Sequence, residues 1–377
     1  MSRRRVVALF RRVAAEIRRD RPSLGILFIA PILLTGLVSF ILRESQAPTV
    51  TADIVNGAGP GGTVLAGALH TALVDGGATV IDVPDEAAAR SDVEHGRASL
   101  AIILPADPTT GLTVVTLGLD APGESAQIGA VQKSVQGAIA SITGAPARPI
   151  THETIYGRPT DDPVASFAPA IVGFFAYFFV YVLTGVSFLR ERTGGTLERL
   201  LATPVTRAEI VTGYTLGFGL FATVQVIVLL LWALGTVDVP AIGPLPAFSI
   251  GLGIPAVGSP ILAFLVVLLL AIGAVSLGIF LSTFARTELQ VIQFIPLVLA
   301  PQFLLSGVIF PVSSLPAVLQ PLVGFMPLNY AVDGLRQVFI RGADLGVGAL
   351  QLDLAILAAI GVFFGVVASL TIRRDVV

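Results

Sequence analysis

Six stretches of the chain are apolar, nearly free of charge and long enough to cross a membrane. A helix needs about 20 apolar residues to span roughly 30 Å of hydrocarbon. The pattern therefore predicts an α-helical integral membrane protein with six transmembrane helices. Their apolar cores are expected at residues 24–42, 167–189, 210–237, 261–284, 289–310 and 348–372.

The composition supports a membrane environment. Hydrophobic residues make up 54% of the chain and charged residues only 13%, and the mean hydropathy is +0.87. A soluble domain carries about 25% charged residues. This chain could not cover a water-facing surface with polar groups, so lipid is the expected surrounding.

Arginines are distributed unevenly between these stretches, and their bias predicts the orientation. Eight arginines precede the first span, four lie between 190 and 207, and Arg286, Arg373 and Arg374 follow the fourth and sixth spans. Basic residues concentrate on the cytoplasmic side of a membrane. We therefore expect a multi-pass protein of the bacterial inner membrane with both termini in the cytoplasm.

The first span could instead be a secretory signal, because Ser45-Gln46-Ala47 is an acceptable cleavage site. Its apolar core of 19 residues is longer than the 7–15 residues that are usual for a signal. If the helix at 23–43 is retained, the arginine-rich segments between and after the later spans all fall on the cytoplasmic side. We expect this segment to remain as transmembrane helix 1.

Residues 44–166 differ in character from the rest of the chain. Short runs rich in β-branched residues alternate there with helical stretches. Such alternation is typical of a small α/β domain, and the orientation places this domain outside the cytoplasm, between spans one and two. Strands are expected at 52–55, 79–83, 99–104 and 112–117, and helices at 62–75, 85–95 and 124–142.

A glycine-rich run in this domain matches a phosphate-binding pattern at Gly57, Gly59 and Gly62. The bare G-x-G-x-x-G pattern is a weak signal. Pro60 and the extracytoplasmic side both argue against a nucleotide, so we interpret the run as a turn.

The chain contains no recognisable energy source and no catalytic centre. Its single lysine, Lys133, is followed by Ser134 but lacks the glycines of a nucleotide-binding P-loop. There is no cysteine, and the three histidines show no ligand spacing. We predict a protein that is not an enzyme and that itself binds neither a metal nor another cofactor.

Ionisable residues inside a membrane are costly and are usually functional. Only Asp353 lies within a predicted span, near its outer end, while Arg286 and Glu288 stand at the turn between spans four and five. We interpret all three as interfacial residues, which disfavours a proton-coupled carrier.

Two cytoplasmic segments have patterns suited to mechanical coupling. In residues 1–22, the apolar residues Val6, Phe10, Val13 and Ile17 recur at helical spacing, opposite the arginines. This pattern predicts an amphipathic helix that lies in the membrane interface against anionic lipid.

The second segment is the loop of residues 190–209. Two glycines end the incoming helix, residues 196–201 can form a short helix, and Thr206 with Glu209 makes a capping-box pattern. The short helix carries leucines on one face and charges on another, so that a docked partner could push it.

The sequence of this loop resembles the E-R-G-T-L-E-R-L-L-x-T-P motif of type-2 ABC exporter permeases, a family that includes daunorubicin-resistance-type efflux subunits. Here Thr193-Gly194-Gly195-Thr196 stands where the motif is one residue shorter. In that family the loop is the coupling helix that contacts an ATPase subunit, and the resemblance implies the same role here. The ATPase-coupling residues would then be Glu191, Arg192, Gly194, Gly195, Thr196, Leu197, Glu198, Arg199, Leu200, Leu201, Pro204 and Arg207.

Other segments extend the resemblance over nearly the whole chain. Residues 305–311 resemble the F-L-S-G-x-x-F-P end of span five, and residues 328–336 resemble the P-x-x-[YH]-x-x-x-x-[LF]-R segment before the last span. Residues 311–341 are poor in charge, which predicts re-entrant helical pieces at the outer membrane face. The N-terminal helix resembles the family's interfacial connecting helix.

The resemblance implies a function and partners. The chain would be the permease subunit of an exporter for a hydrophobic or amphipathic substrate, paired with a second copy of itself or with a paralogous permease. ATP and Mg²⁺ would be used by a separate cytoplasmic ATPase, and no nucleic acid is expected. The alternative is a membrane-anchored scaffold or sensor whose external domain binds a partner.

Polar residues within the apolar spans are the candidates for a substrate path. Each could equally join two helices through a hydrogen bond. They are Tyr177, Tyr181, Gln225, Gln293 and Gln302.

Overall fold

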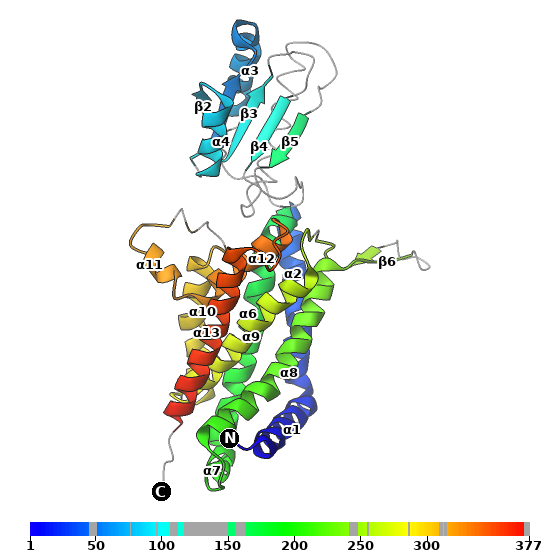
Figure 1. The fold of residues 1–377 in the computed structure, drawn as a ribbon. Helices are drawn as coiled ribbons and strands as arrows, with labels where there is room; N and C mark the ends of the chain where they lie inside the picture. Colours follow the sequence, from blue (N-terminus) through cyan, green and yellow to red (C-terminus); the bar gives the residue numbers. More distant parts are fainter. Residues whose placement is uncertain are drawn as a thin grey trace. The chain divides into compact units, whose positions relative to one another are not determined.

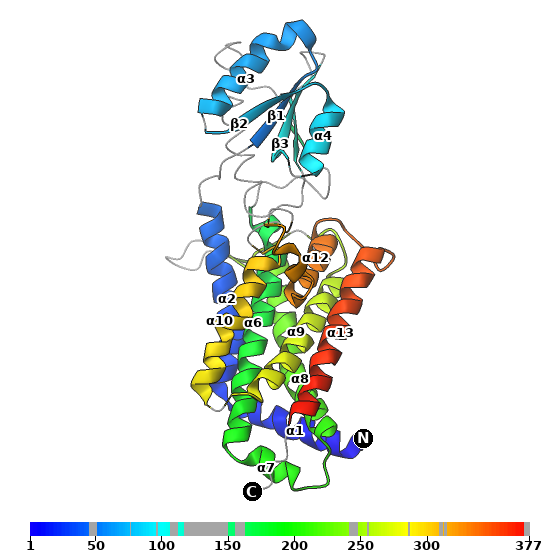
Figure 2. The same ribbon diagram turned by 90° about the vertical axis from the view of Figure 1, so that its left-hand side faces the viewer.

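A computed structural model describes two compact units of the chain. One comprises Met1–Ser39 with Ala168–Val377, and the other Phe40–Phe167. Figures 1 and 2 show the helices of the first unit and the sheet of the second. The described residues are 1–44, 51–75, 77–95, 97–105, 112–116, 150–154, 163–240, 248–254, 256–285, 287–308, 312 and 315–372.

The first unit, together with the helix ends that lead out of it, is almost entirely helical. A two-stranded antiparallel hairpin, β6 (Val237–Val239) with β7 (Phe248–Ile250), follows its third long helix. The helices are α1 (Arg3–Arg19), α2 (Arg21–Glu44), α6 (Pro163–Thr193), α7 (Thr196–Leu201), α8 (Arg207–Leu234), α9 (Pro260–Ser282), α10 (Glu288–Leu305), α11 (Gln320–Val323), α12 (Pro327–Phe339) and α13 (Gly348–Thr371).

Five of the described helices are long and apolar enough to cross a membrane. They match the predicted spans one, two, three, four and six, and they confirm a helical membrane protein. The five stretches are Arg21–Ile41, Phe167–Thr193, Arg207–Leu234, Pro260–Ser282 and Gly348–Thr371.

The predicted fifth span corresponds to α10, which is shorter than expected. Its apolar part, Leu289–Leu305, falls below the length of a full span. The helix ends at Leu305 because Gly307 follows in the left-handed conformation, with φ of +71°. A glycine in this conformation is the commonest end of a helix. The last predicted residues, 309 and 310, lie outside the described residues.

Close contacts between small residues hold the long helices together. A Cβ at Gly278 of α9 would lie 3.1 Å from the Tyr181 carbonyl oxygen and 3.2 Å from the Gly185 nitrogen, both on α6. Membrane helices lack a hydrophobic driving force between them and rely on such close packing. The missing side chain lets the two backbones approach.

The second unit is built around a five-stranded sheet in the order β2-β1-β3-β4-β5, whose neighbours are parallel except for the antiparallel β3 and β4. The four strands expected from the sequence are confirmed to within about one residue. The bounds are β1 (Thr51–Asn56), β2 (Thr79–Val83), β3 (Leu100–Leu104), β4 (Leu112–Thr116) and β5 (Ile150–Thr154).

Two described helices cover opposite faces of this sheet (Figure 2). α3 (Thr63–Asp75) packs on one face, and α4 (Glu86–Glu94) packs on the other. Asp85 caps α4 as expected, because its side chain accepts a hydrogen bond of 2.7 Å from the Ala88 nitrogen. The helix expected at 124–142 lies outside the described residues.

The glycine-rich run is a turn, as predicted. It continues into the short 3₁₀ helix η1 (Gly59–Gly62), and the Asn56 side chain donates a hydrogen bond of 2.9 Å to the Gly59 carbonyl oxygen. A Cβ at Gly62 would lie 2.2 Å from the Asn56 side-chain oxygen. The asparagine therefore occupies the space that a side chain at residue 62 would need.

A buried carboxyl group makes the second unit sensitive to pH. Asp53 on β1 is fully buried, and neither carboxylate oxygen accepts a hydrogen bond from a described residue. Burial raises the pKa of Asp53 to about 6, and the nearby Asp92 adds to this shift while Arg97 opposes it. The folded unit thus binds a proton more tightly than the unfolded chain does.

We expect the second unit to lose stability as the pH rises through about 6, and Asp53→Asn to remove this loss. Because the folded pKa is raised, the stabilisation is complete below the ordinary pKa of 3.8 and is lost as the pH rises to about 6, which leaves a difference of roughly 1 kcal/mol between pH 5 and 7.5. Amide hydrogen exchange of the full chain at pH 5 and 7.5, followed in β1 and β3, measures the effect. Asp82→Asn, on an exposed side chain of β2, is the control. Equal pH dependence in wild type and Asp53→Asn would contradict the assignment.

Candidate functional site

The loop between α6 and α8 has the geometry of a short helix held on a tight turn. The Gly194 nitrogen donates to the Arg190 carbonyl oxygen at 2.9 Å, and the Gly195 nitrogen donates to that of Arg192 at 3.0 Å. Gly195 has φ of +69°, a conformation that other residues rarely adopt. The turn ends α6 at Thr193, and α7 starts three residues later, at Thr196.

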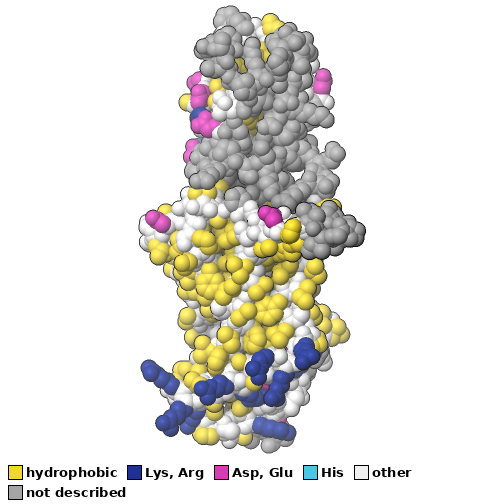
Figure 3. Space-filling view, turned by 90° about the vertical axis from the view of Figure 1, so that its right-hand side faces the viewer, with side chains coloured by type: hydrophobic (Ala, Val, Ile, Leu, Met, Phe, Trp, Pro, Cys, Tyr) yellow, Lys and Arg dark blue, Asp and Glu magenta, His cyan; other side chains and the backbone are white. Residues whose placement is uncertain are grey.

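The two faces of α7 differ as the sequence predicts. Leu197 is buried and Leu200 and Leu201 are half-buried, whereas Glu198 and Arg199 are exposed. α7 lies at the same end of the helical unit as α1 (Figure 1). Lys and Arg side chains gather at this end on the face drawn in Figure 3. The helix therefore presents a pair of opposite charges at the arginine-rich end.

The chain returns from α7 to α8 through a capping box, as expected. The Glu209 nitrogen donates to the Thr206 hydroxyl oxygen at 3.2 Å, and the Thr206 nitrogen donates to a Glu209 carboxylate oxygen at 2.9 Å. The Thr203 hydroxyl donates to the Leu200 carbonyl oxygen at 2.6 Å. These contacts fix the position of α7 relative to the first turn of α8.

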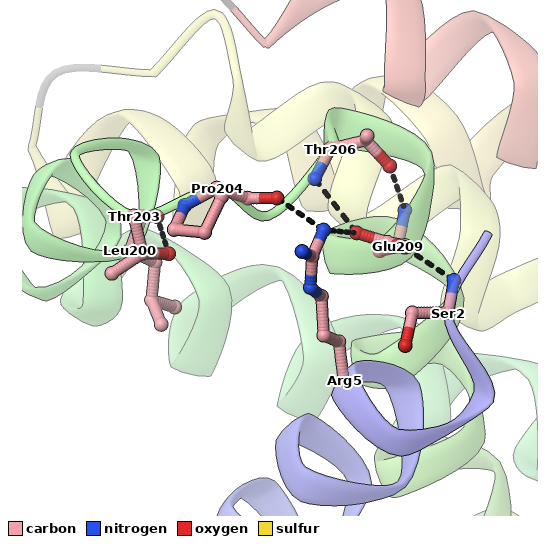
Figure 4. A network of polar contacts seen from close by, with 7 residues as sticks. All are labelled: Ser2, Arg5, Leu200, Thr203, Pro204, Thr206 and Glu209. Atoms are coloured by element: carbon pink, nitrogen blue, oxygen red, sulfur yellow. Dashed lines mark hydrogen bonds and ion pairs between the residues drawn. The ribbon is translucent and has the colours of Figure 1, made fainter.

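The start of α1 is bound to the same capping box (Figure 4). The Ser2 nitrogen donates to Glu209 Oε1 at 2.5 Å, and Arg5 Nη1 lies 3.6 Å from Glu209 Oε2. Arg5 also donates to the carbonyl oxygen of Pro204. Glu209 therefore joins the N-terminal segment, the loop and α8 at one carboxylate.

A second ion pair ties α1 to the end of α6. One terminal nitrogen of Arg12 donates to both carboxylate oxygens of Glu191, at 2.7 and 2.8 Å. Glu191 is only 5% exposed. Burial raises the pKa of Glu16 to about 7, with a further contribution from the neighbouring Glu191 and an opposing one from Arg12. Arg12 lies 3.9 Å from the exposed Glu16 but 2.7 Å from Glu191, so Glu191 is its main partner.

The apolar face of α1 packs directly on α8. Val6, Leu9, Val13 and Ile17 are buried, and Leu9 and Val13 lie against two glycines, Gly213 and Gly217. The sequence placed Phe10 on this face, but Phe10 is only half-buried. Leu9 takes the position because it fits the space above Gly213, where a Cβ would lie 2.5 Å away.

Arg192, one of the predicted ATPase-coupling residues, faces into the protein. Its guanidinium donates to the carbonyl oxygens of Ser282 at 2.6 Å and of Ala285 at 3.0 Å. Ser282 is the last residue of α9, where carbonyl groups lack partners within the helix, and Ala285 follows shortly after it. Arg192 therefore joins the turn after α6 to the end of α9.

The five residues predicted to line a substrate path differ in burial and in their contacts. Tyr177 and Tyr181 are buried on α6 and stack with ring centroids 6.3 Å apart. Gln225 of α8 is buried, and its amide has no hydrogen-bond partner among the described residues. Gln293 is exposed on α10. Gln302 is buried and accepts a hydrogen bond of 3.1 Å from the backbone nitrogen of Leu328, in the first turn of α12.

The position of Asp353 contradicts the prediction from the sequence. It was expected at the membrane interface, but it is 5% exposed and accepts a hydrogen bond of 2.8 Å from the Gln337 amide. The same amide nitrogen donates to Asp333 at 3.0 Å. Gln337 lies on α12, within the segment 311–341, so the buried carboxylate joins this segment to α13.

A comparison with known protein families shows which family the chain belongs to. The profile of a family described as ABC-2 family transporter protein matches residues 22–370. The chain belongs to this ABC-2 family. It is therefore a transporter membrane subunit, and the loop of residues 190–209 lies inside the matched region.

Curated relatives of this ABC-2 chain carry permease or transporter names. "Inner membrane transport permease YhhJ" of Escherichia coli (strain K12) is 33% identical over 196 residues, which is 52% of this chain and 48% of YhhJ. "Linearmycin resistance permease protein LnrN" of Bacillus subtilis (strain 168) is 27% identical over 199 residues, 52% of this chain and 47% of LnrN. "ABC transporter G family member 20" of Dictyostelium discoideum is 31% identical over 206 residues, 55% of this chain but 26% of that protein. The matches thus span about half or less of each relative.

Proposed function

We propose that the chain is the permease subunit of an ATP-binding-cassette exporter, and that it moves a hydrophobic or amphipathic substrate outward. The ATP is hydrolysed by a separate cytoplasmic subunit that docks on α7. The observation that carries this proposal is the geometry of α7. Its charges face outward while its loop is bound to α6, α8 and α1.

The proposed arrangement has six spans, with α10 as the fifth, and an extracytoplasmic α/β domain between spans one and two. The end of α13 lies at the same end of the helical unit as α1 and α7 (Figure 1). An even number of crossings is needed to bring the chain back to the side on which it started. The arginine bias makes that side cytoplasmic.

The proposed mechanism transmits a push from the ATPase into three helices. α7 cannot move far by itself, because the two-glycine turn and the capping box fix its ends. The N-terminal segment is tied to Glu191 by Arg12, and to Glu209 by Arg5 and Ser2. ATPase closure would therefore displace α1 and the ends of α6 and α8 together.

A second permease, either a copy of this chain or a paralogue, completes the proposed exporter. α2 and α10 carry large exposed apolar side chains that suit either lipid or another subunit. These side chains include Ile26, Ile29, Leu33, Leu37, Ile292, Leu297 and Leu304. The names of relatives support the substrate class, since one is called a linearmycin resistance permease and another a probable multidrug permease.

Inside-out vesicles that contain the chain and its co-expressed ATPase test the proposal. Uptake of lipophilic dyes is expected to require both ATP and the ATPase, and to continue when an uncoupler collapses the proton gradient. Dye uptake that follows the proton gradient without ATP would refute it. Absence of any ATP-driven uptake, together with failure to co-purify an ATPase, would favour the scaffold or sensor.

A further inference from the structure

A groove opens between α8, α9 and α13, away from all five residues proposed for the substrate path. Its cavity volume is about 410 Å³, and its walls are mainly apolar, with Val211, Leu269, Ile272, Leu357 and Val362 among them. Volumes of this size are typical of ligand pockets. The α8 and α13 walls come from the first turns of α8 and the later turns of α13. Because α8 begins and α13 ends at the arginine-rich end, the groove lies in that half of the unit.

Missing side chains on α13 create this hollow. At Gly361 the helices α13 and α9 are close, since a Cβ there would lie 3.6 Å from the Gly273 nitrogen of α9. One turn later, a Cβ at Gly365 would meet only the Ser276 hydroxyl oxygen, at 3.8 Å. The groove is therefore an apolar hollow between helices that pack closely at Gly361, and such a hollow suits a flexible hydrocarbon chain.

Polar and positive groups lie toward the arginine-rich end of the groove. Thr212 and Ser369 contribute hydroxyl groups to its wall. Ala208, which also lines it, directly follows Arg207, whose side chain is exposed and makes no ion pair with a described residue. Arg207 is the first residue of α8 and lies one helical turn before the groove residue Val211, so both are on the same face of the helix. This end of the groove complements an anion.

We propose that the groove binds an acyl chain of an anionic phospholipid from the leaflet facing the arginine-rich end. The acyl chain lies between α8, α9 and α13, and the phosphate lies beside Arg207. The adjacent face of α8 holds α1 through Gly213 and Gly217. The bound lipid therefore contacts the same helix that α1 and the α7 loop hold.

Native mass spectrometry of the purified full-length chain tests this site through binding alone, independently of transport. We expect phosphatidylglycerol to be retained roughly tenfold better than phosphatidylcholine with the same acyl chains. Gly365→Leu, which fills the groove, should lower phosphatidylglycerol retention by a similar factor. Gly219→Leu is the matched control on α8, because a Cβ at Gly219 meets no atom within 4 Å. Arg207→Gln should remove the preference for the anionic lipid.

Photo-crosslinking gives a second measurement that needs no variant. Phosphatidylglycerol with a diazirine on its acyl chain should label the α13 peptide 357–369 in the wild-type chain. Labelling of α2 and α10 alone would overturn the site. Equal retention of the two lipids by the wild type, or full retention by a folded Gly365→Leu chain, would also overturn it.

Discussion

Reversing the charge of Glu198 is expected to lower ATP-driven transport strongly while the chain still folds and enters the membrane. The Glu198 side chain is exposed on α7 and makes no ion pair with a described residue, so its removal costs little within the chain. A like charge placed against a docked partner costs several kcal/mol. We therefore expect Glu198→Arg to lower both ATPase co-purification and dye uptake more than about tenfold.

Asp82→Arg is the matched control for this change. Asp82 is also exposed, but it lies on β2 of the second unit. Its reversal should leave transport and co-purification at wild-type levels. Normal transport by Glu198→Arg, at normal amounts in the membrane, would show that α7 does not dock the ATPase.

Removing Arg12 is expected to release α1 from the helical unit and to destabilise the protein by about 2–4 kcal/mol. The physical reason is that Glu191 is almost fully buried and would lose its ion-pair partner. The Arg12 side chain itself is one-third exposed, so the loss is smaller than for a fully buried pair. Tryptic cleavage within residues 3–19 and thermal unfolding in detergent measure the effect.

A second substitution separates the orphaned charge from the loss of contact. Arg12→Ala with Glu191→Gln should recover most of the lost stability, because the buried charge is gone. Arg11→Ala, at an exposed neighbour on α1, should change little. The account of this ion pair is wrong if Arg12→Ala is as stable as Arg11→Ala, or if the double variant shows no recovery.

Local features of the loop of residues 190–209 were predictable because neighbouring residues determine them. The two glycines, the short helix 196–201 and the capping box of Thr206 and Glu209 all follow from rules that act over a few residues. The same holds for the long apolar helices and for the first four strands of the second unit.

Contacts between distant segments could not be predicted in this way. Arg12 and Glu191 are 179 positions apart, and each looks like an ordinary surface charge in the sequence. Arg192 was predicted as an ATPase-coupling residue, and the motif alone does not reveal that α9 ends beside it. Asp353 looked interfacial because its partner, Gln337, lies on another helix.

Two errors have a local cause that the sequence does contain. The fifth predicted span was too long because hydropathy continues beyond Leu305, although Ser306-Gly307 carries a helix-ending signal. Phe10 was preferred to Leu9 because both suit a helical period, and only the glycines of α8 decide between them.

Cross-linking from the tip of the α7 loop tests the central claim most directly. The chain has no cysteine, so a single one can be placed at Ala202, which is exposed at the end of α7. With a short bifunctional reagent in native membranes, Ala202→Cys should cross-link to a protein that carries a P-loop. Leu345→Cys, exposed in the loop before α13, should not. The account is contradicted if Ala202→Cys captures no ATPase, or if Leu345→Cys captures it equally well.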